Sequence, residues 1–131
     1  MRVRYLPLVF LIILFSANLS QVGAQTAKTR PATTFSQKMT QSESEMKWSK
    51  RYYKSYNRTM EIAYLRLSAN HCAKAVQILK EAQSVLPNTT TYYYKVKNSR
   101  FDACRFYDEL LSSSKKLSSE YHLTDITNLC Q

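Results

Sequence analysis

Residues 72–87 have the sequence CAKAVQILKEAQSVLP, and the pattern in this stretch decides the fold class. Small and apolar side chains recur there at intervals of three and four residues, which places them on one face of an α-helix. Pro87 ends this helix because proline lacks an amide hydrogen and disfavours a helical conformation in the residue before it. The residues of the apolar face are Cys72, Ala75, Val76, Leu79, Ala82 and Leu86.

The segments on both sides of this helix are also expected to be helical. Residues 42–45 have the sequence SESE, which fits a capping box, so a helix should begin at Ser42 and break at residues 68–70. Further helices are expected over residues 92–111, with Phe101 on the buried side, and near residues 117–129. After Gly23 the chain has no glycine to make tight β-hairpins. We therefore expect an all-α protein, a small antiparallel bundle of three to four helices.

Residues 63–87 resemble one unit of the tetratricopeptide-repeat family, an antiparallel helix pair with small residues where its helices touch. Thr59 and Arg66 stand where the family has aromatic residues, and Asn70-His71 falls where the family turns between its helices. The resemblance implies a helical hairpin in the middle of the bundle and a protein-binding scaffold. The matching positions are Ala63, Ala75, Leu79, Ala82 and Pro87.

Residues 1–24 have the composition of a secretory signal peptide. Arg2 and Arg4 precede an apolar run that is shorter than the roughly 20 residues needed to span a bilayer. Small residues end the segment, so we expect cleavage near Ala24, a secreted or periplasmic protein, and no transmembrane segment after cleavage. Residues 25–41 are rich in Thr, Ser and Gln and are expected to form a flexible arm. Residues 42–131 then form the helical domain.

The three cysteines, Cys72, Cys104 and Cys130, leave at least one thiol free or paired between chains. In an antiparallel helix hairpin, residues equidistant from the turn face each other, and Asn88 lies midway between Cys72 and Cys104. This geometry predicts a Cys72–Cys104 disulfide and leaves Cys130 as a free or intermolecular thiol. A Cys104–Cys130 pair is the rival, and three buried thiols are the third alternative. Their spacing does not fit a structural zinc site, so neither a metal nor a cofactor is expected.

Basic and aromatic residues alternate between Lys47 and Arg58, where the chain has no acidic residue. Loss of Arg2 and Arg4 with the signal leaves 17 of the 19 basic side chains against 9 acidic ones, so the remaining chain is basic. Cations beside aromatic rings bind anionic or flat groups, whereas a solvated helix face beside core aromatics is the plainer interpretation. The candidate binding residues are Lys47, Trp48, Lys50, Arg51, Tyr52, Lys54, Tyr56 and Arg58.

The chain lacks the common hydrolase, metalloprotease and phosphate-loop motifs, so we expect no catalytic residues and no enzyme activity. The expected function is an exported interaction module that binds a protein or another anionic partner. The alternative is a peripheral protein whose basic helix lies on an anionic membrane or cell-envelope surface. Nucleic acid is not an expected partner outside the cell, and the sequence does not indicate the oligomeric state. Asn57 and Asn88 begin sequons that matter only in a eukaryotic secretory pathway.

Overall fold

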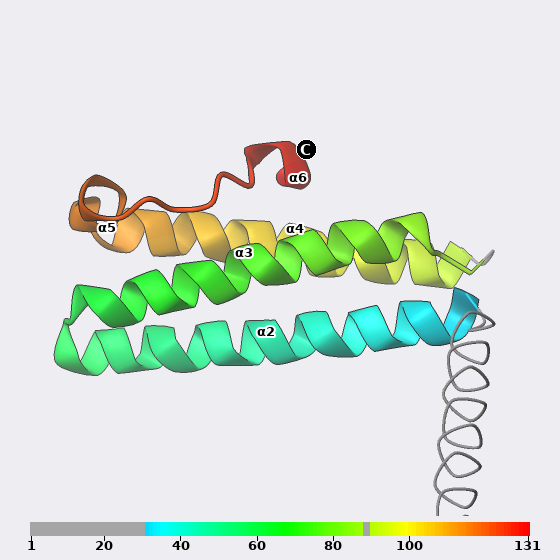
Figure 1. Cartoon of the computed structure of the whole chain (residues 1–131), viewed down its shortest axis with the longest axis horizontal. Coiled ribbons are helices and arrows are strands. Elements are labelled where there is room, and N and C mark those ends of the chain that lie inside the picture. Colours follow the sequence, from blue (N-terminus) through cyan, green and yellow to red (C-terminus); the bar gives the residue numbers. More distant parts are fainter. Residues whose placement is uncertain (1–30, 88–89) are drawn as a thin grey trace, which may run out of the picture. The chain divides into compact units, whose positions relative to one another are not determined.

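The computed structural model describes residues 31–87 and 90–131, which form five helices and no strand (Figure 1). The three long helices are α2 (Pro31–Thr59), α3 (Ile62–Ser84) and α4 (Thr90–Ser113), and the two short ones are α5 (Lys115–Glu120) and α6 (Thr127–Cys130). The prediction of a small all-α bundle is therefore confirmed. The signal peptide and the first residues of the expected arm lie outside the described residues.

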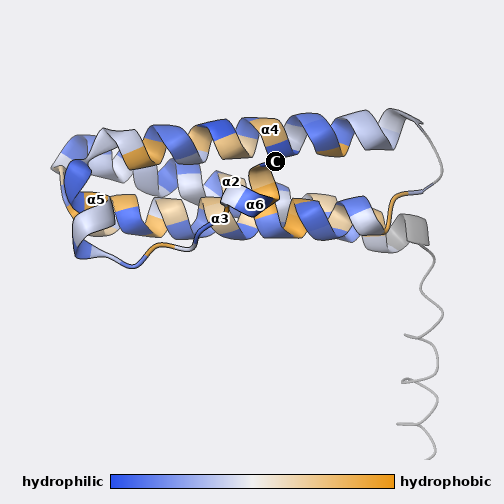
Figure 2. Cartoon of the chain, turned by 90° about the horizontal axis from the view of Figure 1, so that it is seen from above, coloured by the Kyte–Doolittle hydropathy of each residue, from blue (hydrophilic) through white to orange (hydrophobic). Residues whose placement is uncertain are grey.

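Helix α3 is the centre of the bundle. It packs along α2 and α4, whereas α2 and α4 touch each other only slightly. The C-terminal segment turns back at α5 and returns along α4, so that α6 lies against α3 and α4 (Figure 1). Apolar and polar residues alternate along each long helix in Figure 2, as expected of amphipathic helices that bury one side.

The core is built mainly from α3, as the pattern of residues 72–87 predicts. Leu65, Cys72, Val76 and Leu79 are at most 1% exposed. Helix α4 adds a second set of buried residues that begins with Val96, and Leu117 of α5 closes one end. The remaining buried positions of α3 are small: Ser68, Ala69, Ala73, Ala75 and Ala82. Small residues on the central helix let its two neighbours approach closely.

The first turn lies at Met60-Glu61, so the expected break at residues 68–70 is wrong. Asn70-His71, expected at a turn, lies within α3, and the described residues give no evidence for a tetratricopeptide-like repeat. Met60 has a positive φ of 58°, and its amide donates to the carbonyl of Tyr56 at 2.7 Å, which closes the end of α2. Glycine usually takes this left-handed position. A turn made without glycine carries little sequence signal.

Two buried serines join α2 and α3 at their closest approach. The hydroxyl of Ser49 donates to the carbonyl of Ser68, and the hydroxyl of Ser68 donates to the carbonyl of Ser49, both at 2.7 Å. Both side chains are fully buried and fully bonded, so they carry no desolvation penalty from an unmade hydrogen bond. This pair helps to set the register of the hairpin. Its midpoint falls between Arg58 and Thr59, two residues before the centre of the turn at Met60-Glu61.

Helix α2 extends through residues 31–41, so the prediction of a flexible arm is wrong for this segment. Phe35 and Met39 are buried, and the ring of Phe35 contacts that of Tyr92 edge-on at 5.0 Å. Ser42 does not cap a helix, since its hydroxyl donates to the carbonyl of Met39 at 2.8 Å. The segment is mostly polar, but Phe35 and Met39 are four positions apart and share one helical face. These two side chains are enough to hold that face on the core.

The disulfide joins Cys104 to Cys130, with their Cα atoms 5.8 Å apart, so the rival pairing is the correct one. The predicted Cys72–Cys104 bond is wrong, and so is the prediction of a free Cys130. The hairpin geometry predicts the neighbour of Cys72 on α4 to within one residue. The buried thiol of Cys72 donates to the carbonyl of Ala103, which precedes Cys104, at 3.2 Å. Adjacent helix residues point about 100° apart. Cys104 therefore points past α3 toward α6, while Cys72 stays in the core.

Candidate functional site

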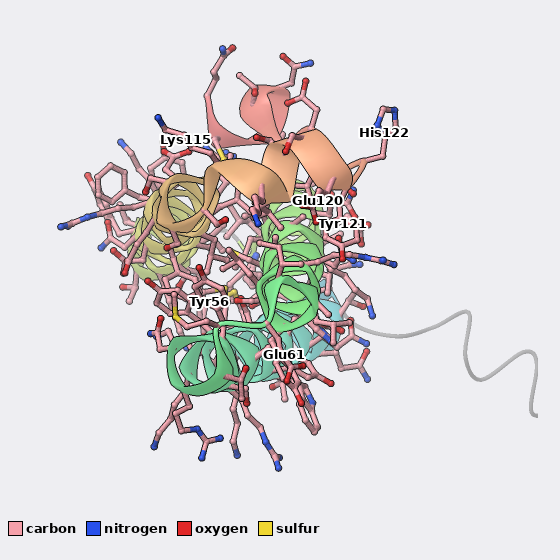
Figure 3. The ribbon with its side chains drawn as sticks, turned by 90° about the vertical axis from the view of Figure 1, so that its left-hand side faces the viewer. Tyr56, Glu61, Lys115, Glu120, Tyr121 and His122 are labelled. Atoms are coloured by element: carbon pink, nitrogen blue, oxygen red, sulfur yellow. A yellow bond between two sulfur atoms is a disulfide. The ribbon has the colours of Figure 1, made fainter. Side chains whose placement is uncertain are left out.

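The basic residues of the second half of α2 lie on its solvent side, and together they are called the basic face. In the end-on view of Figure 3, nitrogen-tipped side chains extend from α2 away from the other helices. All of these cations are exposed, and none forms an ion pair with a residue of segments 31–87 or 90–131. The basic face consists of Lys47, Lys50, Arg51, Lys54 and Arg58.

An aromatic cluster lies beside the basic face, where α2 meets α3. The rings of Trp48 and Tyr52 from α2 lie close to those of His71 and Tyr64 from α3. Trp48 is 43% exposed, while the other three rings are half-buried. The guanidinium of Arg51 lies over the Trp48 ring, 5.0 Å from its centroid, and this cation–π contact connects the cluster to the basic face.

Tyr56 does not belong to this surface, so its place among the binding residues is a wrong prediction. Its side chain is only 6% exposed, it points between the helices in Figure 3, and its hydroxyl donates to the carbonyl of Ser113 at 3.4 Å. The physical reason is the helical repeat. Four residues make slightly more than one turn of 3.6 residues. A row with a spacing of four therefore winds around the helix, from exposed Trp48 through Tyr52 to buried Tyr56.

Glu45 is a residue of this site that sequence reasoning missed. Its carboxylate contacts His71 Nδ1 and accepts from Lys74 Nζ at 2.7 Å. Burial on its own would raise the pKa of Glu45, but the hydrogen bonds from Lys74 and His71 outweigh it and hold this pKa below its usual value. The only sequence signal is that Glu45 and His71 are equidistant from Arg58, two residues before Met60, and that signal requires the true turn to be known.

The basic residues of α4 do not form a second face. The guanidinium of Arg100 donates to Gln83 of α3 at 2.6 Å, while Lys95 lines a small hollow beside Phe35 at the α2 side. Two residues along a helix change direction by about 200°, so Lys97 points away from Lys95. Phe101, predicted on the buried side of α4, is 65% exposed. The core positions of α4 begin with Val96 and continue at Ala103 and Tyr107.

Besides the small hollow at Lys95, the bundle has two hollows lined by residues of several elements. One, of about 420 Å³, lies between α2 and α4 over Leu79 of α3, with Met46 and Asp102 in its lining. The other, of about 530 Å³, lies under the C-terminal segment beside Tyr107 and His122. Burial raises the pKa of Tyr107, whose hydroxyl donates to the carbonyl of Thr124 at 2.9 Å. Neither hollow pairs a nucleophile with a base, and the described residues contain no group of three side chains suited to a metal ion.

Comparison with known proteins adds no family to this description. No protein-family model, no curated protein and no solved structure matches the chain. Among the helices of the described residues, none combines the length and the apolar character needed to cross a bilayer.

Proposed function

We propose that this protein is an exported helical interaction module that binds an anionic partner through the basic face of α2. The observation that carries the proposal is an unbalanced charge. Five exposed cations share one side of a helix, and none has an acidic partner among the described residues. Glu45, beside the aromatic cluster, already forms hydrogen bonds with His71 and Lys74. Long-range attraction brings the partner to this face, and Trp48 and Arg51 then contact it directly.

Two observations support export. The composition of residues 1–24 is that of a signal peptide. The Cys104–Cys130 disulfide is compatible with an extracellular location, because such bonds persist mainly in oxidising compartments.

The test compares two triple variants with the same change in net charge. K47E/R51E/K54E reverses the basic face, and K80E/K97E/K116E reverses three exposed lysines on α3, α4 and α5. Binding is measured by calorimetry at low salt with three polyanions: chondroitin sulfate, poly-L-glutamate and anionic vesicles. We expect the face variant to lose binding to every polyanion that the native protein binds, while the control variant retains it. Equal loss in both variants would show that net charge alone drives binding.

A peripheral membrane protein is the second candidate, and the position of Trp48 favours it. This residue is the only tryptophan of the chain, lies beside the basic face and is 43% exposed. Aromatic residues of this kind settle at the membrane interface when a basic helix lies on anionic lipid. Its fluorescence should shift to the blue with anionic vesicles and stay unchanged with neutral ones. The absence of a shift with anionic vesicles rules out this candidate.

A further inference from the structure

Four of the five cations of the basic face, all except Lys50, form a row rather than a cluster. Lys47, Arg51, Lys54 and Arg58 are separated by four, three and four residues. With a rise of 1.5 Å per residue, the steps are about 6, 4.5 and 6 Å, and the row is about 16 Å long. A compact cluster would suit a single phosphate group. One cation for each helical turn instead suits a linear polymer that carries negative charges at regular intervals.

An aromatic cluster lies next to this row. The rings of Trp48, Tyr52 and His71 are tilted by 18–29° to one another, with centroids 5.4–6.4 Å apart. These separations are those of offset-stacked rings that pack around one another. Trp48 is the most exposed of the three, at 43%. The apolar faces of sugar rings pack on exposed aromatic side chains of this kind.

Hydrogen-bonding groups surround the aromatic cluster. The hydroxyls of Tyr52 and Tyr64 belong to half-buried side chains that form no side-chain hydrogen bond within residues 31–87 and 90–131. The side chain of Glu45, which lies at the same place, is 15% exposed. Hydroxyl donors and acceptors of a ligand can pair with these groups. A polyanion that also carries many hydroxyls therefore fits better than one that carries charge alone.

We propose that the partner of the basic face is a linear acidic polysaccharide, a glycan bearing sulfates or carboxylates. The glycan lies along α2 with its charges on the cationic row and its sugar faces on the aromatic cluster. This inference rests on the proposed function, for which it names the class of partner. An acidic polypeptide would use the row but has no sugar rings for the aromatic cluster.

The experiment measures the affinity of the native protein for a chondroitin sulfate octasaccharide by calorimetry. Poly-L-glutamate of equal charge, oligo-dT and anionic vesicles serve as comparison ligands. We expect the octasaccharide to bind about tenfold or more tightly than poly-L-glutamate, a preference of about 1.4 kcal/mol. W48A and the milder W48L should remove most of this preference, because they weaken octasaccharide binding much more than poly-L-glutamate binding. Circular dichroism confirms that both variants keep their helices.

The outcomes separate the two proposals. Octasaccharide binding that depends on both the cationic row and Trp48 supports the polysaccharide. If poly-L-glutamate, oligo-dT or vesicles bind equally well through the basic face, the polysaccharide inference is wrong and the proposed function stands. If no polyanion distinguishes K47E/R51E/K54E from K80E/K97E/K116E, both proposals are wrong. Octasaccharide binding that W48A and W48L leave unchanged also overturns the inference, because the row alone then accounts for it.

Discussion

The Cys104–Cys130 disulfide should be a major source of stability in this small domain. The two residues are 26 positions apart, and in the chain-entropy model a closed loop of this size contributes about 3.5 kcal/mol. Domains of this size have total stabilities of about 5–15 kcal/mol. A loss of this size should lower Tm by roughly 15–25 °C, since 1 kcal/mol corresponds to about 4–8 °C in a domain of up to 100 residues.

The perturbation is Cys130→Ser, because Cys130 is exposed and its replacement disturbs no packing. Urea unfolding followed by circular dichroism, without reductant, gives the free energy of unfolding of both proteins. The figure of 3.5 kcal/mol is an upper bound, because α5 and α6 can detach from the folded variant and recover part of the chain entropy. Cys72→Ala is the control. It removes a core thiol but retains the bridge. Reductant should therefore lower the Tm of this variant by the same amount as it lowers the Tm of the native protein.

A stability of Cys130→Ser within about 0.5 kcal/mol of the native value would refute this reasoning, because α5 and α6 would then contribute nothing to the folded state. Peptide mapping of the unreduced native protein provides a separate check. A peptide that links Cys72 to Cys104 would contradict the observed pairing. A peptide that links Cys104 to Cys130, together with one buried thiol, is the expected result.

Three further predictions concern single residues. Met60→Gly should raise the free energy of unfolding in urea by about 0.5–1 kcal/mol, because relief of the positive φ outweighs the greater chain entropy of glycine; a loss of stability would contradict the strain at this turn. The stability that Glu45 contributes should be present above its unfolded pKa of 4.5 and disappear as the pH falls through its lower folded pKa. The Glu45→Gln variant should lack this acid dependence. Identical acid unfolding curves for the variant and the native protein would refute the role of the carboxylate. Burial raises the pKa of Cys72 to about 12, so iodoacetamide should label it at pH 8 only in denaturant, and fast labelling of the native protein would show that the core opens there.

The buried helix faces could be predicted because they depend on the period of apolar residues. The residues that were predicted wrongly are those whose role depends on the direction in which a side chain points around its helix. The buried side of α3 from Cys72 to Ala82 follows directly from the spacing of three and four. Cys104 and Tyr56 both lie in helices, as predicted, but their side chains point in other directions around the helix than the predictions require. A shift of one residue turns a side chain by about 100°. Spacing alone does not show which neighbour lies in that direction.

The first turn was missed for a different reason. Ser68 and Asn70 are weak helix formers, and local propensity favours a break there. Tertiary contacts override that preference, since Ser68 and Ala69 are buried against α2 and the hydroxyl of Ser68 is fully bonded to Ser49. The actual turn uses Met60 in a conformation that methionine rarely adopts. Without a glycine or proline at that point, no local signal distinguishes it from helix.

The position of this turn determines whether the candidate site exists. The basic face depends on α2 alone, so its cations could be identified from their spacing. The aromatic cluster depends on the register between α2 and α3, because it opposes Tyr52 to Tyr64 and Glu45 to His71. A turn at residues 68–70 would have placed these pairs far apart. The hairpin therefore adds to a simple row of charges the aromatic rings and hydroxyl groups through which we propose that a polysaccharide is distinguished from other polyanions.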